Sequence, residues 1–204
     1  MRVAPDADGR FEIPATPGEW RLLWVDAKGL AVERRVRVDA NPVVFSTLRA
    51  DAADPPAAPK PRKIDFDALV KGDTLVEIPN GFAGLEWTNW VVTHPKVYGT
   101  GFYHVVVSPE YVAYNSSGHP ATISSARPFD LAGTYVALVW PQAESRNVVV
   151  RAWRGDRLAY EESLRLRAGT PVWFDADWRA ITRIEFAHEA YWQVAVDDLV
   201  VRTE

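Results

Sequence analysis

The feature of this sequence that most restricts its fold is a series of short apolar runs separated by turn residues, with no amphipathic helix between them. Residues 158–166, for example, alternate apolar with polar positions directly after the turn sequence Arg154-Gly-Asp-Arg157, which is typical of a half-buried antiparallel strand. Short strands at regular spacing without intervening helices indicate an all-β chain folded as an antiparallel sandwich or jelly roll. The strands predicted on this basis are Ile64–Leu69, Leu85–Val91, Tyr103–Val107, Tyr111–Tyr114, Ala121–Ser125, Phe129–Trp140, Asn147–Arg154, Arg157–Leu166, Thr170–Asp175, Ile181–Ala187 and Gln193–Arg202.

The composition excludes several classes of partner and site. The chain of 204 residues suffices for one sandwich and a smaller piece, and its hydrophobic share of 48% supports a buried core. A net charge of −4 gives no electrostatic basis for binding nucleic acid or an anionic membrane. No apolar run approaches the roughly 20 residues that cross a bilayer, so we expect no membrane insertion. The absence of Cys excludes disulfides, thiolate metal sites and cysteine nucleophiles.

A Pro-rich segment divides the chain into two parts. Residues 49–63 contain four Pro within seven positions, which favours an extended polyproline II linker. We therefore predict a small N-terminal β segment at 1–48 and a sandwich domain at 64–204. Three strands are too few for independent stability, so we expect the N-terminal segment to dock on the larger domain or on a second copy of the chain. The three strands predicted there are Arg10–Pro14, Glu19–Asp26 and Leu30–Val38.

Two short motifs in the N-terminal segment carry a resemblance to a known repeat. Asp8-Gly-Arg-Phe-Glu-Ile-Pro14 is followed by Pro17-Gly-Glu-Trp-Arg-Leu22. A turn, a Phe-containing strand, Pro-Gly and a long strand in this order resemble the prealbumin-like (carboxypeptidase-regulatory) β-sandwich repeat. The resemblance covers residues 6–44 and lacks the first strands of that repeat, so we expect only part of such a domain.

A second resemblance rests on motifs spread over the larger domain. Ile64-Asp-Phe-Asp67 opens the domain, Ile78-Pro-Asn-Gly-Phe-Ala-Gly-Leu-Glu-Trp-Thr-Asn89 follows, and Val194-Ala-Val-Asp-Asp-Leu-Val200 closes it. Their order over residues 64–201 resembles a group of exported β-sandwich domains of bacteria and fungi, similar to carbohydrate-binding modules of the jelly-roll type, with Phe82 in place of the Tyr of that group. The resemblance implies a jelly-roll sandwich and a non-catalytic, ligand-binding role, but it fixes no ligand.

Aromatic residues near turns are the candidates for ligand contact. Trp87 and Trp90 lie three residues apart in a Gly-rich stretch, where either ring can stack on a sugar while Asn89 binds a hydroxyl. The alternative is that strand alternation buries at least one of the two Trp in the core. Three Tyr residues beside loops are further candidates for ligand contact, with the alternative that they pack at an end of the sandwich. They are Tyr98, Tyr103 and Tyr111.

Four acidic residues at the ends of the larger domain form a candidate calcium site. They are Asp65, Asp67, Asp197 and Asp198. If the first and last strands of the sandwich lie side by side, these carboxylates meet, and calcium prefers several hard oxygen ligands. The alternative is that the carboxylates are solvated or cap turns, since only one of two successive side chains can face inward.

The sequence contains no recognisable catalytic motif. Asp175 and Asp177 with Glu185 or Glu189 have the residue types of a glycosidase pair, but nothing in their spacing places them across a cleft. The four His show no metal-ligand spacing, and a Gly-x-Ser-x-Gly elbow is absent. We therefore predict that the chain is not an enzyme.

These observations favour a non-catalytic binding module that recognises an extracellular carbohydrate through Trp and Tyr stacking. The alternative is a structural or assembly domain whose aromatics lie in the core or at an interface, and burial of both Trp87 and Trp90 would favour it. Arg outnumbers Lys 18 to 5 beside many Ala, which is typical of a GC-rich bacterial genome. Residues 1–8 lack the apolar core of a signal peptide and begin in turn-like sequence, so we expect neighbouring domains in an extracellular or cell-surface parent protein.

Overall fold

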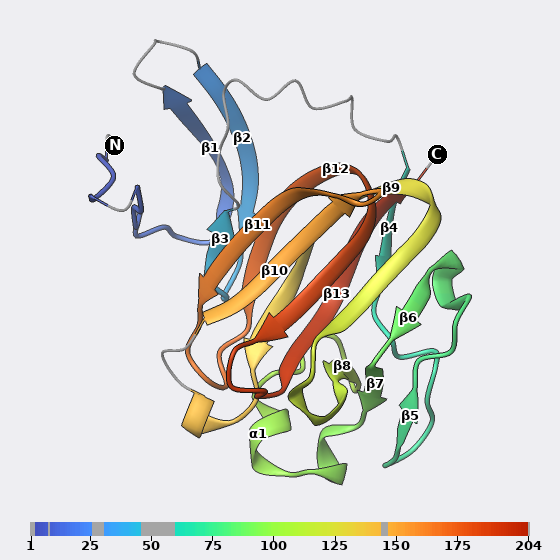
Figure 1. Cartoon of the computed structure of the whole chain (residues 1–204). Coiled ribbons are helices and arrows are strands. Elements are labelled where there is room, and N and C mark those ends of the chain that lie inside the picture. The colour runs from blue at the N-terminus through green and yellow to red at the C-terminus, as the bar shows by residue number, and fades with distance from the viewer. Residues whose placement is uncertain (1–2, 8, 26–30, 46–59, 144–146, 204) are drawn as a thin grey trace.

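Two long strands run side by side through most of the molecule (Figure 1). β9 (Ala121–Leu138) pairs with β12 (Val172–His188) at both ends, with Phe186 opposite Ala121 and Val172 opposite Val136. The register shifts three times between these ends, and Asp177 and Ala180 adopt positive φ there. Such bulges bend and twist a strand pair. Each strand therefore contributes its two ends to different parts of the same sandwich.

The computed structural model describes residues 3–7, 9–25, 31–45, 60–143 and 147–203. Within these residues an eleven-stranded sheet has the order β11-β10-β12-β9-β13-β8-β7-β5, with β3 on β12, β4 on β13 and β6 on β9, and a separate sheet pairs β1 with β2. All pairs of strands are antiparallel except β3 with β12. The other strands are β1 (Gly18–Val25), β2 (Ala31–Val38), β3 (Val43–Phe45), β4 (Lys60–Ile64), β5 (Leu75–Glu77), β6 (Glu86–Thr88), β7 (Trp90–Thr93), β8 (Val112–Asn115), β10 (Asn147–Arg154), β11 (Arg157–Arg165) and β13 (Val194–Thr203). The helical turns are η1 (Phe82–Gly84), η2 (Pro95–Val97), α1 (Thr100–Tyr103), η3 (Ser116–Gly118) and η4 (Pro141–Ala143).

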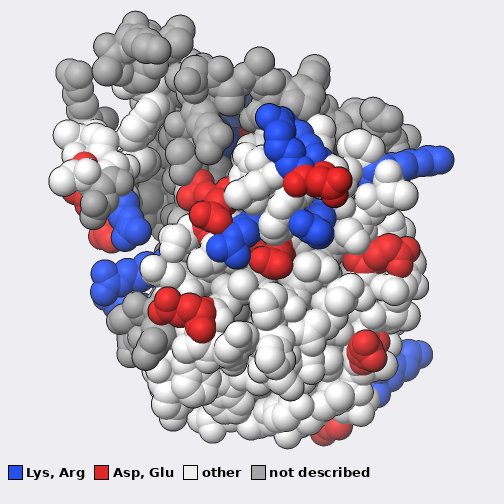
Figure 2. Space-filling model, in the orientation of Figure 1, with Lys and Arg blue, Asp and Glu red and all other residues white. Residues whose placement is uncertain are grey.

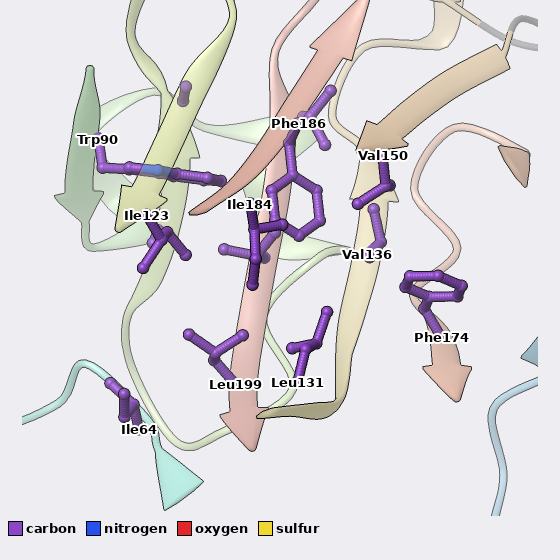
Figure 3. Packing of buried hydrophobic residues seen from close by; sticks show 14 of the residues in the cluster. Ile64, Trp90, Ile123, Leu131, Val136, Val150, Phe174, Ile184, Phe186 and Leu199 are labelled. Carbon is purple, nitrogen blue, oxygen red and sulfur yellow. The ribbon is translucent and has the colours of Figure 1, made fainter. Parts of the chain in front are cut away.

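The main core is an aromatic and aliphatic cluster enclosed by the sandwich. Trp90 is fully buried and meets Trp87 edge-on at 6.4 Å and Phe186 edge-on at 5.6 Å. Figure 3 shows the Trp90 ring pointing toward Ile123 and Phe186 from a different strand. Edge-to-face packing of this kind adds to the free energy gained from burial alone. The predicted all-β sandwich is therefore confirmed, and its core depends on residues from both long strands.

A second, smaller core covers the outer face of β7, β8, β13 and β9. Its buried residues alternate along these strands with residues of the main core. Phe102 and Val105, three positions apart, pack on this outer face from α1 and the residues after it. The predicted strand at Tyr103–Val107 is wrong, because the apolar spacing there is that of a helical turn. The members of the second core are Val91, Phe102, Val105, Val112, Tyr114, Ala137, Val139 and Ala195.

The N-terminal segment differs from the predicted three-stranded unit. β1 and β2 form a two-stranded sheet, but Arg10–Pro14 is not a strand, and Phe11 instead packs on Trp24 at 5.1 Å. The third strand is β3, which joins the larger sheet beside β12. Part of the predicted linker, residues 49–59, lies outside the described residues. Its last four residues belong to β4 and pair with β13, so the predicted linker extends too far along the chain.

Charged side chains connect this hairpin to the sandwich. Arg34 of β2 forms an ion pair with Asp177 of β12. The hydroxyl of Tyr135 donates to the carboxylate of Asp39, and burial together with that carboxylate raises the pKa of Tyr135 to about 12. The N–H of Trp173 also donates to the carbonyl of Pro42 at 2.8 Å. The hairpin is therefore held by side chains as well as by the short β3–β12 pairing.

No helix in the described part of the chain is long and apolar enough to cross a membrane.

Replacing Trp90 with Ala should remove a fully buried ring that contacts two other aromatics. We expect this variant to lose about 3–5 kcal/mol of unfolding free energy, measured by urea denaturation. Tyr103→Ala is the matched control, because that ring is 53% exposed and its loss should change stability by about 0.5 kcal/mol or less. Equal stabilities of the two variants would contradict the core packing.

Candidate functional site

The Trp pair predicted to contact ligand is buried. Trp87 is 4% exposed and Trp90 is 0% exposed, and their ring N–H groups donate to the carbonyls of Phe82 and Thr122 at 2.9 and 3.1 Å. Neither ring presents a face to solvent, so the stacking role predicted for them is wrong. The expected alternation fails because Asn89 between them has a positive φ of 64°, which turns both rings into the core.

Asn89 also has a structural role in place of the predicted hydroxyl contact. Its side-chain amide donates to the carbonyls of Ser116, His119 and Pro120 at 3.0–3.3 Å. Asn tolerates the left-handed backbone conformation better than most residues, which explains its presence at this turn. The side chain therefore connects the corner between β6 and β7 to the η3 turn through hydrogen bonds.

The three predicted Tyr have different positions. Tyr111 is 3% exposed, donates its hydroxyl to the carbonyl of Gly72 at 3.1 Å and packs edge-on against His94, so its predicted ligand role is wrong. Tyr98 and Tyr103 are 44% and 53% exposed. These two rings alone among the predicted aromatic contacts present surface to a ligand.

Tyr98 belongs to an aromatic cluster on the second core that we call the aromatic cap. The cap consists of Tyr98, Phe102, Tyr114 and Trp140. The Tyr98 ring stacks on Phe102 at 5.1 Å with 28° between the ring planes, and its hydroxyl lies 3.0 Å from the hydroxyl of Tyr114. Phe102 meets Trp140 edge-on at 5.9 Å. Tyr98 is therefore exposed and yet fixed in orientation.

Local sequence explains how the cap forms. Pro95 begins η2, and the ring nitrogen Nδ1 of His94 caps this turn by accepting from the N–H of Lys96 at 3.2 Å. Gly101 then lies so close to the sheet that a Cβ would come within 2.8 Å of the Val139 carbonyl oxygen. A residue with a side chain would move α1 away from β9. Gly at this position lets Phe102 reach the second core.

The aromatic cap is electrically neutral. Burial and the neighbouring Tyr98 hydroxyl raise the pKa of Tyr114 well above its usual range. Figure 2 shows a surface mostly free of charged side chains over the end of the molecule where α1 lies in Figure 1. Sequence reasoning missed Phe102, Tyr114 and Trp140. The aromatic density of residues 98–103 marked the place, but no sequence signal connects Trp140 with it.

The acidic ends of the first and last sandwich strands do meet, as the calcium hypothesis required. Ile64 of β4 is paired with Leu199 of β13. Asp197, however, accepts from the N–H groups of Val107 and Ser108 at 2.8 Å, and from the Ser108 hydroxyl at 2.8 Å. Its carboxylate therefore holds a loop in the position where a cation was expected.

The other three Asp residues of the predicted calcium site also have protein partners. Asp67 accepts from the N–H groups of Glu110 and Tyr111 at 3.1 and 3.2 Å. Asp198 pairs with Lys63 at 2.8 Å, and the backbone carbonyl of Asp65 accepts from the Ser108 hydroxyl. Within the described residues, no group of three His, Asp or Glu could hold a metal ion. The carboxylates of Asp67 and Asp197 are thus better explained as a clamp on loop 107–111 than as calcium ligands.

Burial raises the pKa of Asp197 to about 6, although its four donors favour the charged form. Asp175 on β12 has a similar shift with the same main cause. Burial raises its pKa to about 6, and adjacent Asp177 adds to the shift, while Arg34 and Arg202 oppose it. Asp177 itself pairs with three guanidinium groups, those of Arg34, Arg179 and Arg202. A carboxylate held in this way is a poor nucleophile or base, which argues against the glycosidase interpretation.

Comparisons with known proteins identify no family. No protein-family model matches the sequence, and no curated protein matches it. Among solved structures, the K2 cleaved adhesin domain of Lys-gingipain is similar, with a TM-score of 0.47 and 10% sequence identity. The match covers 71% of this chain and 100% of that domain. A likeness at this level describes an arrangement of strands, and no function follows from it.

Replacing Asp197 with Ala should leave two backbone N–H groups of the loop without their buried acceptor. We expect the free energy of unfolding to fall by about 3 kcal/mol or more, because hydrogen bonds to a charged group contribute about 1.5–3 kcal/mol each. Native melting curves in millimolar calcium and in chelator should coincide. A calcium-dependent rise in melting temperature, lost in Asp67→Ala, would restore the metal hypothesis.

Replacing Asp175 with Asn should remove a carboxyl whose pKa is higher in the folded than in the unfolded chain. A raised carboxyl pKa stabilises the fold at low pH, and this contribution is lost as pH rises from about 4 to about 6. One pKa unit corresponds to about 1.4 kcal/mol, so the variant should gain up to about 3 kcal/mol over the native chain between these values. Urea denaturation at pH 4, 5, 6 and 7 measures the difference. A difference independent of pH would contradict the shift.

Proposed function

We propose that this chain is a non-catalytic binding module that recognises a neutral sugar ring of an extracellular glycan at the aromatic cap. The observation that carries the proposal is the state of Tyr98. Its ring is 44% exposed, yet it is stacked on Phe102 and bonded through its hydroxyl to Tyr114. An aromatic ring already held in one orientation loses little conformational entropy when a ligand stacks on it.

The chemistry of the cap fits a sugar. The apolar face of a pyranose ring packs on an aromatic ring, and stacking of bases on aromatic side chains contributes about 1–3 kcal/mol each. Two hydroxyls share one hydrogen bond between Tyr98 and Tyr114, so one hydroxyl proton remains to be donated to another oxygen. The neutrality of the cap favours a neutral sugar over a charged one.

The proposal includes a setting for the module. A single fixed ring gives weak binding, and weak binding becomes useful when several modules act together in one parent protein at the cell surface. The described residues offer no catalytic arrangement beside the cap. The Asp177 carboxylate is occupied by ion pairs with Arg34 of the N-terminal hairpin and Arg202. Recognition rather than turnover is therefore the activity that we propose.

A structural or assembly role is the second candidate, and two observations favour it. Trp87 and Trp90 are both buried, as that role requires. The N-terminal hairpin is also bound to the sandwich by β3 and by the Arg34–Asp177 pair, which suits a spacer with a fixed joint. A chain that binds no glycan but associates with neighbouring domains of its parent protein would support this role.

Replacing Tyr98 with Ala should weaken glycan binding about tenfold or more, and a cooperative melting transition should show that the variant is folded. Tyr98→Phe keeps the ring and removes the hydroxyl, so it should retain most of the affinity if stacking dominates. Leu158→Ala is the control, because this 47% exposed residue lies on β11 and not in the cap. A glycan array followed by titration calorimetry measures all three. Unchanged affinity in Tyr98→Ala would overturn the site, and absence of any glycan binding would overturn the function.

A further inference from the structure

Tyr191, in the turn between β12 and β13, combines high exposure with an unfavourable backbone. The ring is 58% exposed and φ is +55°, a conformation that bulky residues rarely adopt. Residues in sparsely populated backbone regions persist only when the surrounding structure holds them, and they gather at binding sites. Burial of the ring does not explain this strain, because the ring is exposed.

The strained backbone is locked against the η3 turn. Tyr191 donates its N–H to the carbonyl of His188 at 3.0 Å. Its own carbonyl lies against Gly118, where a Cβ would come within 1.6 Å of the carbonyl oxygen. Position 118 therefore admits no side chain, and the two turns interlock. The result is a fixed backbone under an exposed ring.

The partner of this ring is also fixed. The ring of His119 lies 5.0 Å from that of Tyr191, with 57° between the planes. The backbone carbonyl of His119 accepts from the side-chain amides of Asn115 at 2.7 Å and Asn89 at 3.0 Å. His119 is itself exposed. Two exposed rings are thus presented together on a backbone held by the side-chain amides of Asn89 and Asn115.

This ring pair and the aromatic cap lie at the same end of the sandwich. Tyr114, which bonds to Tyr98, is followed directly by Asn115, whose side-chain oxygen accepts from the N–H of Val194 at 2.6 Å. On the other side, Trp140 of the cap donates to the side chain of Gln193 at 2.6 Å, two residues from Tyr191. Figure 1 shows the β12–β13 connection and α1 at this common end.

We propose that Tyr191 and His119 form a second sugar-binding subsite, so that the module binds a neutral oligosaccharide rather than a single sugar. The inference rests on the proposed function of the aromatic cap and extends it. Tyr191 supplies a stacking face, and the His119 imidazole supplies a hydrogen-bonding group for a hydroxyl. A chain whose first ring stacks on Tyr98 continues toward Tyr191, and its affinity rises with the number of units.

The test uses the native chain and length series of β-linked gluco-, xylo- and galacto-oligosaccharides of two to eight units, measured by calorimetry. We expect native affinity to rise about tenfold or more from the shortest to the longest members of at least one series. Tyr191→Asn removes the ring but tolerates the positive φ, and it should abolish this rise while leaving disaccharide affinity unchanged. Tyr191→Phe should keep the rise. Melting curves of both variants should match the native curve.

The outcomes separate the two proposals. Loss of affinity at every length in Tyr98→Ala, with none in Tyr191→Asn, would leave the aromatic cap intact and overturn the subsite. If Tyr191→Asn lowers the affinity equally for oligosaccharides of every length, the proposal that one ligand contacts both sites is overturned. Binding of none of the three series by the native chain would overturn both proposals.

Discussion

The pairing of β9 with β12 supports nearly everything else in this molecule. Each strand has partners at both of its ends. β9 pairs with β6 near its start and with β13 near its end, and β12 pairs with β3 near its start and with β10 near its end. The bulges at Asp177 and Ala180 bend the pair, so the same two strands line the core from different sides. Bulges of this kind occur where a sheet must turn without ending.

Polar side chains in this protein also bind its own backbone. Asn89, Asn115 and Asp197 each hold a loop through its N–H or carbonyl groups. An unpaired buried amide group carries a substantial penalty, so a sandwich with long corners needs such partners. Residue types that suggest ligand recognition are here occupied in loop attachment. What remains for recognition is a small set of exposed rings.

The sequence predicted the local features well and the contacts between distant segments poorly. Residues 147–154 were predicted as a strand with the bounds of β10, because alternation and a tight turn are local properties. The calcium hypothesis required the acidic strand ends to meet, and they do, but loop 107–111, which occupies the carboxylates of Asp67 and Asp197, comes from a distant part of the chain. The burial of Trp87 with Trp90 depends on the backbone of Asn89, and no alternation rule reveals a positive φ. Trp140 joins the aromatic cap only after the sheet has formed.

The N-terminal hairpin has a mechanical consequence. Three paired residues of β3 and a few side-chain contacts attach it to the sandwich, whereas β9 and β12 share a long ladder through the interior. If the chain is pulled by its N-terminus, the load reaches this short joint before it reaches the β9–β12 ladder. Because fewer strand contacts oppose it, we expect the joint to open at a lower force than the ladder, so that chain length is released before the sandwich is loaded.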